Sequence, residues 1–104
     1  MTMEAPVLCA GDILEATGGT PLKGGAEWSC VGLSTDTRTL REGNLFIALM
    51  GDRFDGHDCL AAAAEKRATG LLIRMDRLEK LDSGIKGLPV IGVPDTLRAL
   101  GDIA

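Results

Sequence analysis

Three short runs of the sequence are apolar at nearly every position, and they constrain the fold more than any other feature. They are LFIALM (45–50), LLIRM (71–75) and LPVIGV (88–93). A strand with one wet face alternates apolar and polar residues, so continuous runs predict strands that are buried on both faces. Such strands are typical of α/β proteins, in which helices cover both sides of a largely parallel sheet.

The segment between the first two runs has the features of a helix. Asp55 is the expected N-cap, and Gly70 is expected to end the helix. A strand, a helix and a second strand in succession form a βαβ unit, whose two strands are parallel. The run at 45–50 is the expected central strand.

The remaining elements are expected from turn residues and local patterns. In chain order they are a helix over 8–17 ended by Gly18 and Gly19, a loop over 21–27, a strand over 28–33, turns over 34–38 and 40–44 with Gly43 at positive φ, a helical turn and loop over 76–87, and a helix capped by Asp95 with Leu97, Leu100 and Ile103 as its apolar stripe. Since that stripe runs to the last residue, we expect the helix to lead into a further segment. The sequence thus predicts a single small α/β domain with a mixed, partly parallel sheet, one βαβ unit and helices packed on the sheet.

Composition excludes several classes of protein. The net charge is −4, the eleven basic residues are scattered, and there are only three aromatic residues, so a nucleic-acid surface is not expected. No apolar run is long enough to cross a bilayer. Glu4 and Asp12 lie where a signal peptide would have a basic region followed by an apolar region. Cys9, Cys30 and Cys59 are odd in number and widely spaced, which favours reduced thiols in a cytoplasmic protein over disulfides or a metal site.

Catalysis by this chain alone is not expected. The sequence has no phosphate-binding glycine loop, no nucleophile elbow and only one histidine, His57, so a histidine metal cage cannot form within it. Asp55, His57 and Asp58 could be read as metal ligands or an acid–base group, as in a metal-dependent hydrolase. We prefer a structural role, because a helix cap and the helix dipole account for both carboxylates without a ligand.

Thr35, Asp36, Thr37 and Arg38 form the first candidate binding segment. A local salt bridge beside a turn would explain the two charged residues. Two hydroxyls that alternate with the charges just beyond a strand also suit an anion or a uracil-type ligand. We therefore expect all four side chains to face one crevice.

Gly51, Asp52, Arg53 and Phe54 form the second candidate segment. They precede a helix N-terminus, which favours negative charge; Arg53 could bind a phosphate, and Phe54 could cover a flat base or act as a hydrophobic staple for the helix. The two segments flank the run at 45–50, so we expect a single site whose residues lie at both ends of that strand.

These motifs make the chain similar to a known family. STDTR, GNLFIALMG and DGHDC resemble the successive T-x-D-S-R, G-D-L-F-x-A-L-x-G and D-G-H-D-F patterns of the N-terminal domain of the Mur ligases, which add amino acids to the peptidoglycan precursor. RFDGHD and VPDTLRALGDIA are most similar to the ligases that add D-alanyl-D-alanine. Ligases that add the third peptide residue are the nearest alternative. The resemblance is weakest over 20–30 and 75–88.

The resemblance implies a three-domain ligase of which residues 1–104 are the first domain. This domain would hold the UDP moiety of UDP-N-acetylmuramoyl-tripeptide, the central domain would bind ATP and Mg²⁺, and the C-terminal domain would assist with the incoming amino acid or dipeptide. The chain itself would then be inactive, with no cofactor and no metal of its own, and its partners would be that substrate and the other two domains.

The resemblance also assigns roles to residues. It places uridine contacts at Thr35 and Thr37, with Asp36 and Arg38 completing the first motif, and a second loop at Gly51, Asp52, Arg53 and Phe54. Thr37, Asn44 and Cys59 depart from the usual Ser, Asp and aromatic residue of the family. A stand-alone interaction module, in which the polar clusters are only turns and caps, is the rival interpretation.

Overall fold

The computed structural model describes residues 7–81, 85 and 87–103, so Ala104 and part of the expected loop over 76–87 lie outside it. Its elements, in chain order, are β1 (Val7–Cys9), α1 (Ala10–Thr17), β2 (Thr20–Lys23), β3 (Ser29–Val31), β4 (Leu33–Ser34), β5 (Leu45–Ile47), the 3₁₀ helix η1 (Gly56–Cys59), α2 (Leu60–Glu65), β6 (Gly70–Arg74), the 3₁₀ helix η2 (Met75–Lys80), β7 (Val90–Val93) and α3 (Thr96–Ile103).

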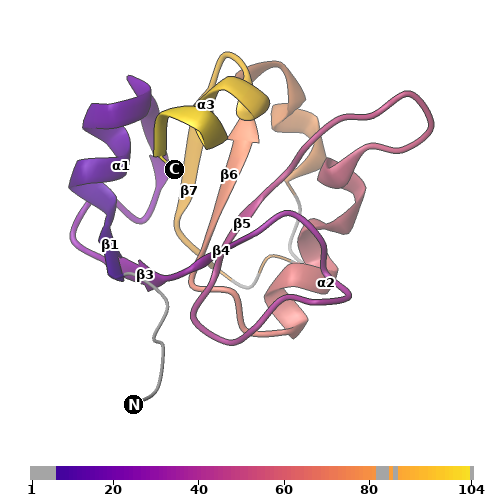
Figure 1. Cartoon of the computed structure of the whole chain (residues 1–104), viewed down its shortest axis with the longest axis horizontal. Helices are drawn as coiled ribbons and strands as arrows, with labels where there is room; N and C mark the ends of the chain where they lie inside the picture. The colour runs from indigo at the N-terminus through magenta and orange to yellow at the C-terminus, as the bar shows by residue number, and fades with distance from the viewer. Residues whose placement is uncertain (1–6, 82–84, 86, 104) are drawn as a thin grey trace.

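The main sheet has the strand order β2-β7-β6-β5-β4 (Figure 1). β4, β5, β6 and β7 are parallel to one another, and β2 joins β7 antiparallel at the edge. The predicted mixed α/β sheet is therefore confirmed, and so is the parallel pair β5 and β6 around η1 and α2. β1 and β3 form a separate antiparallel pair.

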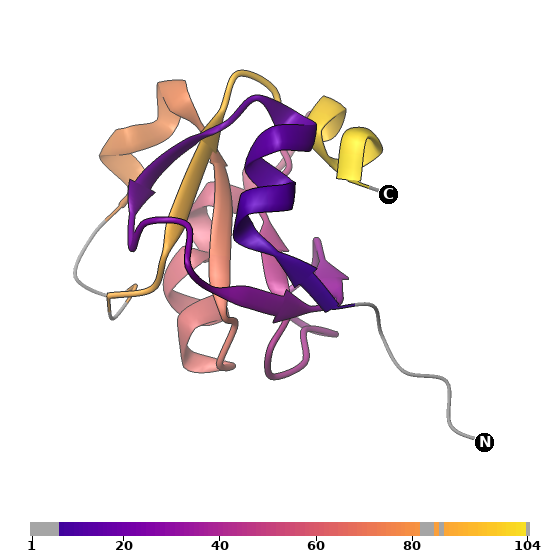
Figure 2. The same cartoon turned by 90° about the vertical axis from the view of Figure 1, so that its left-hand side faces the viewer.

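Helices cover both faces of the sheet, with α1 in front of it and α2 behind it in Figure 2. Leu45 and Ile47 of β5 pack in the core cluster that contains Ile13 of α1 and Ala99 of α3. The intervening Phe46 packs in the other cluster, with side chains of α2. Both faces of β5 are buried, as the apolar run predicted.

Glycines and caps end several elements as expected. Gly18 ends α1 in the left-handed region at φ 66°, where its N–H donates to the Leu14 carbonyl. Gly43 turns the chain at φ 92°. The Asp95 carboxylate accepts hydrogen bonds from the backbone N–H groups of Leu97 and Arg98 and caps α3.

Two expected segments differ in the structure. The predicted loop over 21–27 begins with β2, which pairs with β7 at the edge of the sheet, where a proline is tolerated, and the register shifts between Pro21 and Lys23. The predicted strand over 28–33 is divided at Gly32, whose φ of 78° turns the chain from β3 into β4.

Two helical details also differ. Gly70 was expected to end the helix after Asp55, but α2 ends at Glu65 and the chain turns at Arg67, which has the left-handed conformation at φ 66°. Gly70 is instead the first residue of β6 and lies against the Trp28 ring. Leu97 is 67% exposed, so it does not belong to the buried stripe of α3. None of the helices in the described part of the chain is long and apolar enough to cross a membrane.

Candidate functional site

A cleft of about 500 Å³ opens at the carboxyl ends of β4 and β5. Its walls are formed by Thr35, Asp36, Thr37, Arg38, Phe46, Leu49, Phe54, Gly56 and Cys59. The two candidate loops follow β4 and β5, which are parallel with Ser34 opposite Phe46. Both loops therefore lie at the same edge of the sheet. The expectation of a site formed at both ends of one strand was wrong, because the first loop follows β4, which runs parallel to β5.

The first loop is held by its own side chains. Ser34 Oγ donates to the Asp36 carbonyl at 2.9 Å, and the Asp36 carboxylate accepts the Arg38 backbone N–H at 2.8 Å. The Arg38 guanidinium also donates to both carboxylate oxygens of Asp36, at 2.8–3.2 Å. The hydrogen bonds from the Arg38 side chain and backbone lower the pKa of Asp36 to about 2. Asp36 thus organises the loop and remains ionised at neutral pH.

Thr35 and Thr37 present the open polar groups of the cleft. Within the described residues, neither hydroxyl has a hydrogen-bond partner, although both residues line the cleft. A threonine hydroxyl can donate one hydrogen bond and accept two. The loop therefore offers two hydroxyls to a ligand. The Arg38 guanidinium already donates to Asp36 through Nε and Nη2.

The second loop is held by hydrogen bonds between its own backbone groups. Gly51 N–H donates to the Phe54 carbonyl at 2.8 Å, and Met50 forms an isolated bridge with Asp55. The Phe54 ring lies over Gly51, where an added Cβ would be 3.1 Å from two ring carbons. Phe54 is 58% exposed and lines the cleft, as a side chain that covers a ligand must. Gly51 supports the ring from below without lining the cleft.

Asp52 and Arg53 are exposed in the second loop and do not line the cleft. They were expected in the site because they precede a helix N-terminus, where Arg53 could bind a phosphate, and because the family resemblance places its second loop at these residues. In the structure the turn from Gly51 to Phe54 directs the ring to the cleft, and Asp52 and Arg53 form the outer part of that turn.

The floor of the cleft was not anticipated from the sequence. It consists of Phe46, Leu49 and Cys59, together with the backbone at Gly56. Phe46 is 1% exposed and its ring belongs to the core as well as to the cleft. The pairing of Ser34 with Phe46 brings this side chain beside the first loop, and only the parallel register of β4 and β5 could have indicated it.

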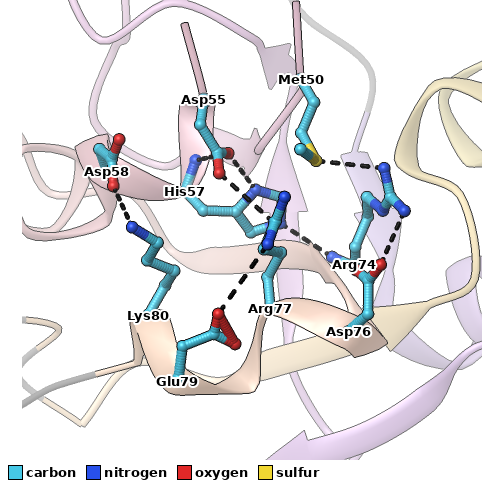
Figure 3. A network of polar contacts seen from close by, with 9 residues as sticks. All are labelled: Met50, Asp55, His57, Asp58, Arg74, Asp76, Arg77, Glu79 and Lys80. Atoms are coloured by element: carbon cyan, nitrogen blue, oxygen red, sulfur yellow. Dashed lines mark hydrogen bonds and ion pairs between the residues drawn. The ribbon is translucent and has the colours of Figure 1, made fainter.

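Asp55 and His57 have structural partners (Figure 3). The Asp55 carboxylate accepts the backbone N–H of His57 at 2.9 Å and so caps η1, as predicted. The buried His57 ring contacts the same carboxylate through Nδ1 at 2.6 Å and accepts the Arg74 backbone N–H at Nε2. Burial disfavours the charged form of Asp55, but the hydrogen bonds from His57 outweigh it and lower the pKa of Asp55.

Asp58 pairs with a lysine instead of joining a metal site. Lys80 Nζ lies 2.7 Å from Asp58 Oδ1, and this hydrogen bond raises the pKa of Lys80. In residues 7–81, 85 and 87–103, no group of three or more possible metal ligands is found. The metal-dependent hydrolase interpretation therefore has no support in these residues.

The cleft has the chemistry of a binding site. An apolar floor with an exposed phenyl ring suits a flat ring, and a few hydroxyls at the rim suit its polar edge. The described lining residues do not pair a nucleophile with a general base, as covalent catalysis requires. The arrangement suits the recognition of a flat ligand with a polar edge.

Comparisons with known proteins agree with this architecture. Residues 30–104 match the model of the Mur ligase family, catalytic domain. The chain is 40% identical over 80 residues to the UDP-N-acetylmuramoyl-tripeptide--D-alanyl-D-alanine ligase of Escherichia coli (strain K12), a match over 77% of this chain and 16% of that protein. It is 30% identical over 93 residues to the UDP-N-acetylmuramoyl-L-alanyl-D-glutamate--2,6-diaminopimelate ligase of Bacteroides thetaiotaomicron, a match over 89% of this chain and 18% of that protein.

A solved structure shares the fold. The UDP-N-acetylmuramoylalanyl-D-glutamyl-2,6-diaminopimelate--D-alanyl-D-alanyl ligase from Acinetobacter baumannii superposes with a TM-score of 0.79 and 26% identity, over 98% of this chain and 22% of that one. The chain thus spans 16% to 22% of the length of these three relatives.

Proposed function

Because this chain belongs to the Mur ligase family, we propose that its cleft binds the UDP end of a UDP-N-acetylmuramoyl-peptide. The observation that carries this proposal is the convergence of Thr35, Thr37 and Phe54 on one cleft, from loops that follow two parallel strands. The threonine hydroxyls are available to the polar edge of the uracil ring. Phe54 is available to its face.

We propose UDP-N-acetylmuramoyl-tripeptide as the substrate, in the cytoplasmic step of peptidoglycan synthesis that adds D-alanyl-D-alanine. The 40% identity to the E. coli ligase that is named for this reaction supports the assignment. On this proposal residues 1–104 are the UDP-binding domain of a larger ligase. ATP and Mg²⁺ would be bound by a further domain and would supply the activation of the substrate carboxylate, and this chain alone would be inactive.

A second candidate is the same domain of a ligase that adds the third peptide residue. The 30% identity to the diaminopimelate ligase of B. thetaiotaomicron favours it, and that match extends over more of this chain. The two candidates share the UDP end of the substrate and differ in the acceptor peptide. Stimulation of ATP hydrolysis in the parent protein by D-alanyl-D-alanine or by diaminopimelate would decide between them.

The direct test is a ¹⁵N chemical-shift titration of this chain with UDP-N-acetylmuramoyl-tripeptide, with UDP and uridine as smaller ligands and ADP as the control. We expect shifts in the amides of 34–38 and 51–57, and none of comparable size with ADP. Thr35→Val and Thr37→Val should weaken binding, because valine keeps the shape of threonine and removes the hydroxyl. Thr20→Val on the edge strand β2, away from the cleft, is the matched control.

Two outcomes would count against the proposed function. Equal responses to UDP and ADP would contradict recognition of uracil by this cleft. An absence of shifts at millimolar ligand in both this chain and its parent protein would favour the interaction-module interpretation, in which the polar clusters are only turns and caps.

A further inference from the structure

His57 connects the cleft to a strand that does not line it. The side chain is 1% exposed and lies behind the second loop, between Asp55 and the end of β6 (Figure 3). It is absent from the residues that line the cleft, so it cannot act by direct contact with a ligand there. Its hydrogen bonds nevertheless reach the loop that carries Phe54.

The hydrogen bonds of His57 determine its tautomer. The backbone N–H of Arg74 can only donate, so Nε2, at 3.0 Å, accepts. In the neutral ring the proton therefore resides on Nδ1, which donates to Asp55 Oδ1 at 2.6 Å. The imidazole thus forms a directed bridge from the backbone of β6 to the carboxylate of Asp55.

The second loop is closed internally but is anchored through its end. Gly56 N–H donates to the Leu49 carbonyl at 2.7 Å, Met50 bridges with Asp55, and Gly51 N–H donates to the Phe54 carbonyl. These bonds hold the segment 49–56 together as one unit. Its orientation on the sheet then depends on contacts such as those of the Asp55 side chain, which lies directly after Phe54.

Arg77 of η2 gives Asp55 a weaker second anchor. Its Nε lies 3.5 Å from Asp55 Oδ2, and its side chain is 33% exposed. Within the described residues Arg77 Nε has no hydrogen-bond partner, so this contact is weaker than the 2.6 Å contact between Asp55 and His57. The Asp55 carboxylate also accepts the His57 backbone N–H, but that bond stays within the cap of η1. The buried contact with the His57 ring is therefore the main side-chain connection between Asp55 and β6.

We infer that His57 is a positioning residue for the proposed uridine site. By joining Asp55 to the carboxyl end of β6, it holds the 49–56 loop so that Phe54 remains at the cleft. This inference rests on the proposed function, since it assigns Phe54 to ligand contact. If loss of the bridge left the loop correctly placed for about a tenth of the time, the apparent Kd for UDP would rise about tenfold.

Two substitutions separate the bridge from simple side-chain volume. In His57→Asn the amide nitrogen falls near the position of Nδ1 and can still donate to Asp55, and in His57→Gln the amide falls near Nε2 and can still accept from Arg74. Each variant keeps one end of the bridge and loses the other. Lys80→Met is the matched control, because it breaks the nearby ion pair with Asp58 and leaves the bridge intact.

Binding of UDP should be measured at a temperature at which every variant is fully folded. We expect an apparent Kd about tenfold above the wild-type value for His57→Asn and His57→Gln, by the same population argument, and the wild-type Kd for Lys80→Met. A lowered Tm with an unchanged Kd in either His57 variant would show that the residue only stabilises the fold, and would overturn the inference.

A measurement without ligand tests the inference independently of the proposed function. Backbone N–H residual dipolar couplings report the orientation of the 49–56 loop relative to β6, so the couplings of 50–55 should change relative to those of β6 in both His57 variants and stay at the wild-type values in Lys80→Met. Imidazole ¹⁵N shifts in the wild type should show the proton on Nδ1. Unchanged couplings in both His57 variants, or a proton on Nε2 in the wild type, would refute the positioning role even if UDP binds. A wild-type chain and parent protein that do not bind UDP would refute the proposed function alone.

Discussion

Replacing Gly56 with alanine tests how closely the end of β5 and the start of η1 approach each other beneath the cleft. A Cβ at this position would lie 2.8 Å from the carbonyl oxygen of Leu49, 2.9 Å from its nitrogen and 3.1 Å from Cα of Ala48. All three atoms belong to the backbone, so no side chain can rotate to make room. The need for glycine here is one of space, since Gly56 is not among the residues with positive φ.

The expected cost follows from these contacts. The 2.7 Å hydrogen bond from Gly56 N–H to the Leu49 carbonyl would be stretched or lost, and an unsatisfied buried group costs about 1–3 kcal/mol. Displacing packed backbone costs about 1–3 kcal/mol more. The reduced freedom of the unfolded chain returns at most about 1 kcal/mol. We therefore expect Gly56→Ala to lower the free energy of unfolding by about 3 kcal/mol, or Tm by roughly 12–24 °C for a domain of this size.

Urea unfolding followed by far-ultraviolet circular dichroism is the assay. Gly101→Ala in α3 is the matched control, because an added Cβ there meets nothing within 4 Å. It should raise the free energy of unfolding by about 0.5–1 kcal/mol, since alanine favours the helix. If both substitutions change stability in the same direction and by similar amounts, the steric argument for Gly56 is refuted.

Three further predictions concern the first loop and the end of α2. In the proposed full-length ligase, Thr37→Ala or Arg38→Ala should raise the KM for the proposed UDP substrate more than it lowers kcat, because these groups would hold a part of it that does not react. A loss confined to kcat would contradict that role. The pKa of Asp36 is lowered from 3.8 to about 2, so its bond with Arg38 contributes fully to stability above pH 3.8 and is lost as the pH falls through about 2. An NMR titration of the Arg38 amide with a midpoint near 3.8 would contradict this. Arg67→Gly should stabilise the fold by about 1 kcal/mol in urea unfolding, because it removes the strain of a left-handed non-glycine residue and loses only an exposed ion pair with Glu42. A destabilised variant would show that the ion pair contributes more than the strain costs.

Much of the fold could be predicted because its causes are local. The apolar runs became the buried strands β5, β6 and β7, since composition alone shows that both faces of a strand avoid water. Asp55 and Asp95 cap the helices that they precede, because a carboxylate there meets free backbone N–H groups. Gly18 and Gly43 adopt positive φ for the same kind of local reason.

Other features depended on partners that are distant in the sequence. β2 is a strand because β7 lies beside it, and no pattern in its own residues indicates that pairing. Gly70 begins β6 because the Trp28 ring occupies the space above it. Leu97 was expected to be buried from its spacing, but the packing of α3 against α1 and the sheet leaves it exposed.

The candidate site divides in the same way. The sequence alone determined the polar loop at Thr35–Arg38 and the ring at Phe54, because turns and helix caps form from neighbouring residues. Only the tertiary structure decided that the two loops lie at one edge of the sheet, with Phe46 as the floor between them. The parallel register of β4 and β5 sets that arrangement, and register arises from the packing of both sheet faces together, which no short segment of the sequence contains.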